Sequence, residues 1–272
     1  KKLLIFILIF LGLIAAGYFL IGKTGEEKPA NNPPVIEEQK ASSTSSPQAG
    51  FTVGGEAPDS TSSPQAKPAV EQKPIAAKTG DIVLEVPYAN EAPSGIFAGP
   101  WKNACEEASI AMVQGYYEGK KEISISEAEA FMRQLFEKEN ILYGSDANSD
   151  AARTAEIINK YSSFGAVVKH YPTLEDIKKE IDAGRPVITP NYGFGLQNPN
   201  IPFAATGSSY HMVVVIGYND TTREFITNDS GDIRNGANHR YGYDLFLGTV
   251  RDYAYATNQV NGPARAIFTF PK

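Results

Sequence analysis

Cys105 is the only cysteine of the chain, and it lies where a loop gives way to a helix-like sequence. The N-terminus of a helix carries a partial positive charge and unpaired N–H groups, which stabilise a thiolate. His211 follows about a hundred residues later, directly before an apolar run typical of a buried strand. Asp229 ends the next strand-like segment, and a hairpin would bring it beside His211. A thiol, an imidazole and a carboxylate in this order can activate a thiol nucleophile.

Each of these residues also has an ordinary structural interpretation. A lone cysteine is often inert and buried, a histidine at the start of a strand can belong to the edge of the core, and Asp229 before Gly231 is typical of an Asx turn. Two glutamates, at positions 106 and 107, directly follow the cysteine. Their charges oppose a thiolate, so a protonated His211 must supply most of the activation, with a resting thiolate–imidazolium pair as one form. The remaining histidines, 170 and 239, are expected at the surface.

The elements that would position these groups follow from the apolar periodicity and from the turn residues. Helices are expected first and a mainly antiparallel sheet second, which is an α+β pattern. A long loop at 191–209, rich in Gly, Pro and aromatic residues, precedes His211. The expected helices span 104–117, 126–139, 150–161, 173–184 and 243–253, and the expected strands span 82–86, 166–170, 186–189, 211–218, 224–227 and 265–270.

The N-terminal third of the chain has a different composition. Residues 3–21 include no charged side chain, and about 20 apolar residues are needed to cross a bilayer. We therefore expect residues 1–22 to be a transmembrane anchor with the N-terminus in the cytoplasm, or alternatively a cleaved signal segment. Residues 23–80, rich in Pro, Ser and Thr and carrying STSSPQA twice, are expected to be a disordered linker. Residues 81–272 form the predicted folded domain, which is exported in either case.

Charge and residue usage restrict the possible partners. The net charge is −6 and the sequence has no basic block beyond its start, which argues against nucleic-acid binding. Exported proteins mostly pair their cysteines, so a single one suggests a reactive thiol or an intermolecular disulfide. The three histidines are not spaced as metal ligands and no second thiol is present, so no metal or cofactor is expected. The catalytic domain is expected to be monomeric.

In combination, several segments resemble the C39-like cysteine peptidases of the papain-like superfamily, in a membrane-anchored form. The similarity extends over most of residues 83–270 and does not include the anchor or the linker. It implies a papain-like α+β fold in which Cys105 is the nucleophile, His211 is the base and then the acid, and Asp229 orients the imidazole. The matching segments are VPY at 86–88, ACEEAS at 104–109, YHMVV at 210–214, GY at 217–218 and FITND at 225–229.

One position departs from this family pattern. Related domains often carry a glutamine shortly after the VPY segment, and its amide helps to form the oxyanion hole. Here the corresponding residue is Glu91, and an ionised carboxylate cannot donate a hydrogen bond. The neighbouring Asn90 has an amide that would serve after a shift of one residue. Otherwise Glu91 must be protonated, or the domain has lost its activity.

The sequence therefore predicts an exported, membrane-tethered thiol hydrolase that cleaves amide bonds of peptides, such as cell-surface peptides, through a thioester. Aromatic residues near the predicted site are candidates for a substrate groove, namely Trp101, Tyr192, Phe194 and Tyr210. Two other interpretations stay open. The domain is a degenerate peptidase fold used for binding or adhesion, or it is an exported scaffold in which Cys105 forms an intermolecular disulfide.

Overall fold

The computed structural model describes residues 79–144, 148–202 and 209–272. The predicted membrane segment at 3–21, nearly all of the linker and part of the loop before His211 lie outside these ranges. Among the helices of the described ranges, none combines the length and the apolar character required to span a membrane.

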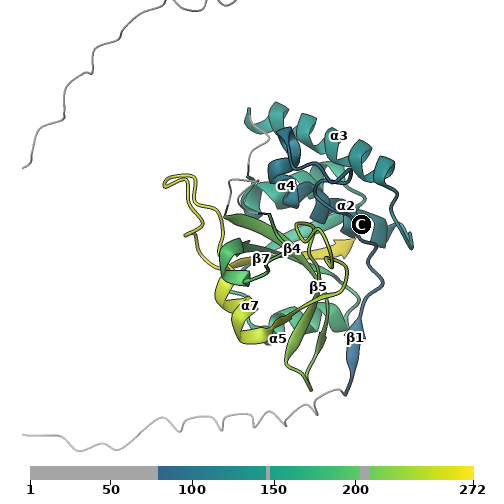
Figure 1. Cartoon of the computed structure of the whole chain (residues 1–272), viewed down its shortest axis with the longest axis vertical. Coiled ribbons are helices and arrows are strands. Elements are labelled where there is room, and N and C mark those ends of the chain that lie inside the picture. The colour runs from purple at the N-terminus through teal and green to yellow at the C-terminus, as the bar shows by residue number, and fades with distance from the viewer. Residues whose placement is uncertain (1–78, 145–147, 203–208) are drawn as a thin grey trace, which may run out of the picture. The chain divides into compact units, whose positions relative to one another are not determined.

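An antiparallel sheet of seven strands runs through the middle of the domain (Figure 1). Six strands follow the order β2-β7-β3-β4-β5-β6, and β1 pairs with the end of β4. The central strand β4 is buried along its whole length, as its apolar sequence predicts. The strands are β1 (Asp81–Val83), β2 (Phe164–His170), β3 (Val187–Tyr192), β4 (Tyr210–Asn219), β5 (Glu224–Asn228), β6 (His239–Gly242) and β7 (Arg265–Pro271).

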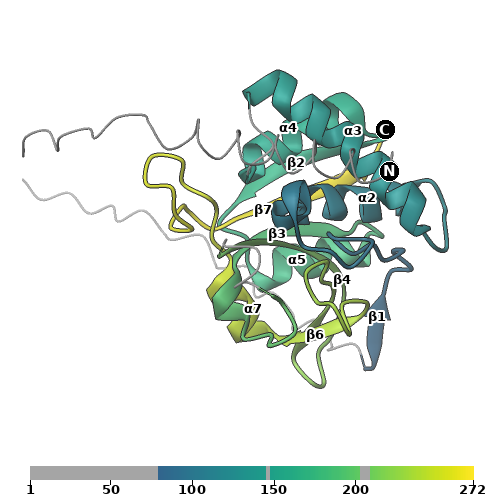
Figure 2. The ribbon, with the colours of Figure 1, turned by 45° about the horizontal axis from the view of Figure 1, so that its top comes forward.

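Helices cover both faces of this sheet. Helices α2, α3 and α4 lie on one face, and α5 and α7 lie on the other (Figures 1 and 2). Each face buries its own apolar cluster against the sheet. The α+β class expected from the sequence is confirmed. The helices are α2 (Cys105–Tyr117), α3 (Ile125–Tyr143), α4 (Ala151–Tyr161), α5 (Leu174–Asp182) and α7 (Tyr243–Thr249), with short 3-10 turns η1 (Gly99–Asn103) and η2 (Gly193–Leu196).

Side-chain caps fix the starts of three helices. The Ser124 hydroxyl accepts a hydrogen bond from the backbone N–H of Glu127 at the start of α3, and the Glu127 carboxylate accepts one in return. Asp150 caps α4, and Thr173 caps α5 together with Asp176, as the sequence indicates. Such caps bind the free N–H groups of the first turn, and each stabilises its helix by about 1 kcal/mol.

The structure differs from the sequence-based expectation at the C-terminal half. The predicted helix at 243–253 ends at Thr249, because Val250 turns into an extended bridge with Asn191. Strand β6 was not expected, since it follows a polar stretch without apolar alternation. The predicted strand at 82–86 is shorter and ends at Val83, whereas α5 and α7 lie between strands as the predicted ranges place them.

Strand β1 lies very close to β4 at Gly217. A side chain at this position would place its Cβ only 2.3 Å from the carbonyl oxygen of Ile82. Glycine is therefore required for the pairing of Val83 with Gly217. This pairing starts the segment that leads through residues 86–91 toward Cys105, so it anchors one wall of the site.

Two carboxyl groups meet in the core between α2 and α3. Glu107 and Glu139 are both buried. Burial, together with the neighbouring Glu139 and Glu106, raises the pKa of Glu107 well above its ordinary value. Burial therefore favours the protonated form of this side chain.

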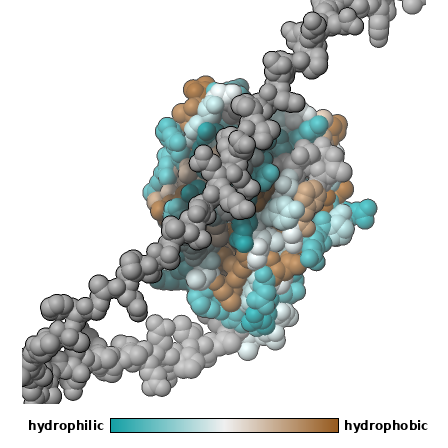
Figure 3. Space-filling view, turned by 90° about the vertical axis from the view of Figure 1, so that its left-hand side faces the viewer, coloured by the Kyte–Doolittle hydropathy of each residue, from teal (hydrophilic) through white to brown (hydrophobic). Residues whose placement is uncertain are grey.

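Apolar side chains at the surface are dispersed. On the face shown in Figure 3, hydrophobic residues form several patches separated by hydrophilic ones. Tyr192 and Phe194 are among the exposed large side chains, and their rings contact each other edge to face with centroids 5.9 Å apart. Such scattered exposure is usual for globular domains and does not by itself indicate an interface.

Candidate active site

Cys105 is the first residue of α2, at the helix end that points toward the sheet. No side chain caps this helix, because the residue before it is Ala104. The thiol is turned toward the next residue, and its Sγ donates a hydrogen bond of 2.9 Å to Oε2 of Glu106. The other oxygen of Glu106 accepts a hydrogen bond of 2.8 Å from the backbone N–H of Ser149. Glu106 is thus a buried partner of the thiol.

His211 lies near the start of β4, and Asp229 directly follows β5. The pairing of Val214 with Asn228 aligns these two strands and brings the side chains together. Nε2 of His211 lies 2.7 Å from Oδ1 of Asp229, which also accepts a hydrogen bond from the backbone N–H of Gly231. The carboxylate fixes the orientation of the ring and leaves Nδ1 facing the opposite direction.

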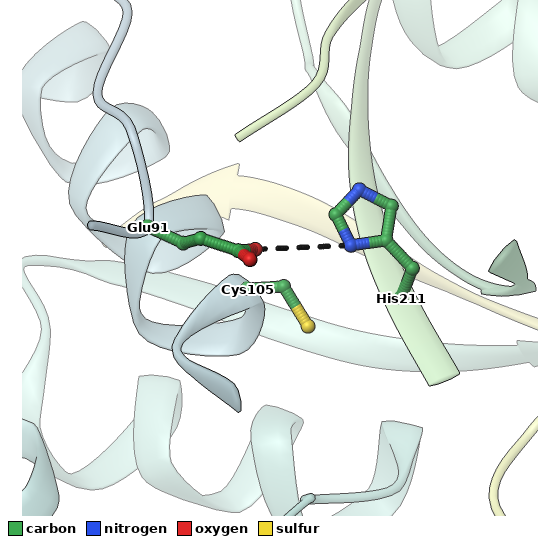
Figure 4. A group of neighbouring side chains, drawn as sticks. All are labelled: Glu91, Cys105 and His211. Atoms are coloured by element: carbon green, nitrogen blue, oxygen red, sulfur yellow. Dashed lines mark ion pairs between the residues drawn. The ribbon is translucent and has the colours of Figure 1, made fainter. Parts of the chain in front are cut away.

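Glu91 faces that second nitrogen. Its Oε2 atom lies 3.8 Å from Nδ1 of His211. The carboxylate of Glu91, the sulfur of Cys105 and the imidazole each offer one atom within 4.8 Å of the other two. Figure 4 shows the carboxylate and the ring pointing toward each other, with the Cys105 side chain beside them. The three side chains come from different segments and are 2–3% exposed.

The protonation states of this group depend on one another. Burial lowers the pKa of His211, but the charges of Asp229 and Glu91 outweigh it and raise the pKa to about 9. Burial acts against the ionised form of Asp229, yet the imidazolium keeps its pKa below the ordinary value. Burial raises the pKa of Glu91 to about 7, against the attraction of His211. At neutral pH the ring is charged and Glu91 is about half protonated.

The thiol does not behave as its position at a helix N-terminus predicts. Burial raises the pKa of Cys105 well above the ordinary value, and the carboxylates of Glu106 and Glu91 raise it further. The direction of this shift favours the neutral thiol of Cys105 over a thiolate, against the stabilising effect expected from the N-terminus of α2.

Asn90 does not take the place of Glu91. Its Nδ2 donates to the hydroxyl of Tyr88 at 3.3 Å, and its Oδ1 accepts from the backbone N–H of Ala92 at 2.8 Å. Both ends of this amide therefore hold the local turn. The side chain that lies next to the thiol and the imidazole is that of Glu91.

The aromatic residues predicted to line a groove divide into two groups. Trp101 packs on Phe136 and under Arg133, and Tyr210 is buried with its hydroxyl donating to the carbonyl of Ser149. The predicted groove role of Trp101 and Tyr210 is therefore wrong, because both are core residues. Tyr192 and Phe194 are 43% and 54% exposed and remain accessible to a ligand.

Three further predictions concern the disulfide of Cys105 and the exposure of His170 and His239. The sulfur of Cys105 is buried, which does not favour an intermolecular disulfide. His170 is exposed, as expected. His239 is only partly exposed, with Nδ1 3.2 Å from Oδ2 of Asp232.

A polar network behind Asp229 was missed by the sequence analysis. Tyr241 on β6 donates a hydrogen bond of 2.5 Å to Oδ2 of Asp229 and accepts one of 3.0 Å from Asn198. Asn198 in turn donates to Asp232, which pairs with His239. No sequence signal pointed to Tyr241, since β6 itself was not expected. The network supplies a hydrogen-bond donor to the second oxygen of the Asp229 carboxylate, which holds His211.

The VPY segment at 86–88 has a structural role in the same region. The Val86 carbonyl accepts a hydrogen bond of 3.0 Å from the Asn228 amide. The hydroxyl of Tyr88 donates to the backbone carbonyls of Asp229 and Asp232, each at 3.2 Å. The segment therefore fixes the loop after β5, and with it the carboxylate of Asp229.

Replacing Tyr241 by phenylalanine should lower kcat/KM about 3- to 10-fold, because one oxygen of Asp229 loses its donor. The carboxylate then holds the imidazolium more tightly, so the pKa of His211 rises and the rising limb of the pH–rate profile moves to higher pH. The measurement is the pH dependence of kcat/KM. Tyr243→Phe is the matched control, since that hydroxyl donates to Asp220. Identical profiles for wild type and Tyr241→Phe would contradict a positioning role.

The family of the chain follows from a comparison with known proteins. The Peptidase_C39-like family matches residues 83–260, which include Glu91, Cys105, His211 and Asp229. The chain belongs to the Peptidase_C39-like family. The match spans more than half of the chain and begins at β1.

A solved structure is also similar to this C39-like domain. It is a C39-like peptidase candidate from Bacillus anthracis, with 15% sequence identity and a TM-score of 0.46. The alignment covers 71% of this chain and 98% of the other. No functionally curated protein matches the sequence.

Proposed function

We propose that this C39-like domain is a thiol hydrolase, a cysteine peptidase or amidase, that cleaves peptide amide bonds. One observation carries the proposal: an imidazole held by Asp229 at 2.7 Å turns its other nitrogen toward a group that contains the Cys105 sulfur. Membership of the Peptidase_C39-like family supports the same chemistry. The triad is Cys105, His211 and Asp229, with Glu91 at the oxyanion position.

Proton transfer starts the reaction. The Cys105 thiol gives its proton to Nδ1 of His211 in the fraction of molecules whose ring is neutral, and Sγ attacks the carbonyl carbon of the substrate. The N–H groups at the start of α2 have no intrahelical partners and are available to the oxyanion. A protonated Glu91 donates a further hydrogen bond to the same oxygen. The imidazolium then protonates the leaving amine, and water activated by His211 hydrolyses the thioester.

Peptides at the cell surface are the proposed substrates. Residues 3–21 have the composition of a membrane anchor, and the Pro/Ser/Thr-rich segment that follows has the composition of a spacer. The acidic net charge gives no support to nucleic acid as a partner. We therefore place the domain outside the membrane, tethered by its N-terminal segment, or secreted if that segment is cleaved.

A binding or adhesion module is the second candidate. Glu91 favours it, because its carboxylate opposes both an oxyanion and a thiolate. The near-complete burial of the thiol points in the same direction. Against it stands the triad geometry, since a module without catalysis has no need of a histidine held at 2.7 Å by a buried aspartate.

Alkylation of Cys105 by iodoacetamide separates the two candidates. At pH 8 the His211→Ala variant should react at least tenfold more slowly than wild type, because the imidazole no longer accepts the thiol proton or stabilises the thiolate. His170→Ala is the control, since that ring is exposed. Hydrolysis of a mixed quenched-fluorescent peptide library should disappear in Cys105→Ala. Equal alkylation rates for wild type and His211→Ala would support the binding module and overturn the hydrolase.

A further inference from the structure

We propose that Glu91, Cys105 and His211 form a binding site for a zinc-class divalent cation, and that the bound cation reversibly blocks the thiol. The three ligand atoms lie within 4.8 Å of one another, and Nδ1 of His211 is 3.8 Å from Oε2 of Glu91. Ligand atoms around tetrahedral zinc are separated by roughly 3.3 to 3.6 Å. The thiol now donates to Glu106, so binding of a cation requires the sulfur to leave this hydrogen bond.

The types of ligand select the metal. A thiolate and an imidazole are bound well by Zn²⁺ and Co²⁺, whereas Mg²⁺ and Ca²⁺ prefer oxygen ligands alone. Three protein ligands leave one position for water, which is the usual arrangement of a reversible or open zinc site. Glutamine at position 91 would offer only a weak neutral oxygen, so the site is a consequence of the glutamate in this chain.

The hydrogen bonds that hold His211 and Glu91 are also of the kind found around metal ligands. Zinc-bound histidines usually donate their other N–H to a carboxylate, and Nε2 of His211 lies 2.7 Å from Asp229. The proposed carboxylate ligand is held as well. Ser230 Oγ donates to Oε2 of Glu91 at 3.4 Å, and the Glu91 N–H donates to the Ser230 carbonyl at 3.1 Å. Both ligands are therefore oriented before a cation binds.

The charges of the deprotonated ligands match a divalent cation. The carboxylate of Glu91, a thiolate at Cys105 and a neutral imidazole carry two negative charges, which Zn²⁺ neutralises. Glu106 adds a further carboxylate at hydrogen-bond distance from the sulfur. Binding breaks the S–H bond of Cys105 and the Nδ1–H bond of the imidazolium, and it releases these protons to solvent. The affinity should therefore rise with pH.

The bound cation affects the nucleophile directly. A sulfur bonded to zinc has its lone pair engaged and Nδ1 of His211 can no longer accept a proton, so attack on a carbonyl stops. Cation binding itself requires only the three ligands. The loss of hydrolysis on binding additionally rests on the proposed function, and the two are measured separately.

Co²⁺ absorption tests the binding. Titration of the whole chain with Co²⁺ should give one equivalent of binding and a near-ultraviolet thiolate-to-cobalt band, which Zn²⁺ displaces. Cys105→Ser should lose the band, and Glu91→Gln should weaken binding at least tenfold. Both changes are nearly isosteric, and Glu122→Gln, at an exposed carboxylate, is the control. The absence of a band in wild type, or equal affinity of wild type and Glu91→Gln, would overturn the site.

Thiol protection tests the consequence. One equivalent of Zn²⁺ should slow alkylation of Cys105 by iodoacetamide at least tenfold, and a chelator should restore the original rate. In Glu91→Gln the same protection should need at least tenfold more Zn²⁺. This readout requires no substrate, so a domain without peptidase activity would still show it. Alkylation that Zn²⁺ leaves unchanged would overturn the blocking of the thiol.

Discussion

The Glu91→Gln variant should hydrolyse peptide amides about 100-fold faster than wild type at pH 8, because a permanent donor replaces a group that is ionised at this pH. Wild-type Glu91, with a pKa of about 7, has mostly lost its proton there. The substitution also removes a negative charge that raises the pKa of Cys105 and of His211. The substitution therefore increases thiolate formation, the neutral fraction of His211 and the stabilisation of the oxyanion. The measurement is kcat/KM on a quenched-fluorescent peptide library.

The pH profiles of the two proteins should differ in shape. In wild type, activity rises as a proton leaves the Cys105–His211 pair, whose imidazole has a pKa of about 9, and falls as Glu91 ionises near 7. These opposing requirements keep the active fraction small at every pH. The Glu91→Gln variant retains only the rising limb, displaced to lower pH. Glu122→Gln should match wild type, and a Glu91→Gln variant without any gain would show that Glu91 does not face the oxyanion.

The Gly231→Ala variant should lose about 10- to 100-fold in kcat/KM, because a methyl group there displaces the imidazole. A Cβ on Gly231 would lie 2.8 Å from Cε1 of His211 and 3.1 Å from Ile201. The His211 ring cannot move away from the new methyl group. Asp229 holds its Nε2 atom, and the pairing of β4 with β3 fixes the backbone of His211. A shift of the ring disturbs both the Nε2–carboxylate contact and the approach of Nδ1 to the thiol.

The control for this variant is Gly248→Ala, at a position in α7 where no atom lies within 4 Å of the new methyl group. Its activity should equal that of wild type. Thermal unfolding of both variants separates displacement of the ring from loss of the fold. If Gly231→Ala folds normally and keeps full activity, the position of His211 in this structure is not the catalytic one.

The candidate triad is brought together by local features that can be read from the sequence. Cys105 follows a loop and starts a helix, and His211 and Asp229 lie on two strands joined by a short connection. The hairpin therefore predicts that His211 and Asp229 meet, whereas the approach of Cys105 is implied by the resemblance to a family. Glu91 could be singled out only through the resemblance to a family, because its distance from His211 depends on the path of the segment after β1.

The remaining parts of the site depend on contacts that no local pattern encodes. The sequence placed a charge at Glu106 beside the thiol but did not show its burial, which follows from the packing of α2 against α3 and β4. The carboxylate accepts a hydrogen bond from the thiol. Tyr241 lies on a four-residue strand that follows a polar loop. The sequence could not distinguish whether the aromatic residues line a groove or pack in the core, because the same rings are used for both. The burial of Trp101 and Tyr210 shows that these two are core residues.

The buried pair of Glu107 and Glu139 between α2 and α3 makes the free energy of unfolding depend on pH. Below a pH of about 4.3 the folded and the unfolded chain both hold the Glu107 proton. Above it the unfolded chain releases that proton while the folded core retains it, because its pKa is raised in the fold. The contribution of Glu107 to the free energy of unfolding therefore decreases as the pH rises above this value. Glu107 thus stabilises the fold most at acidic pH, whereas Glu91 and His211 set a separate pH response for the chemistry.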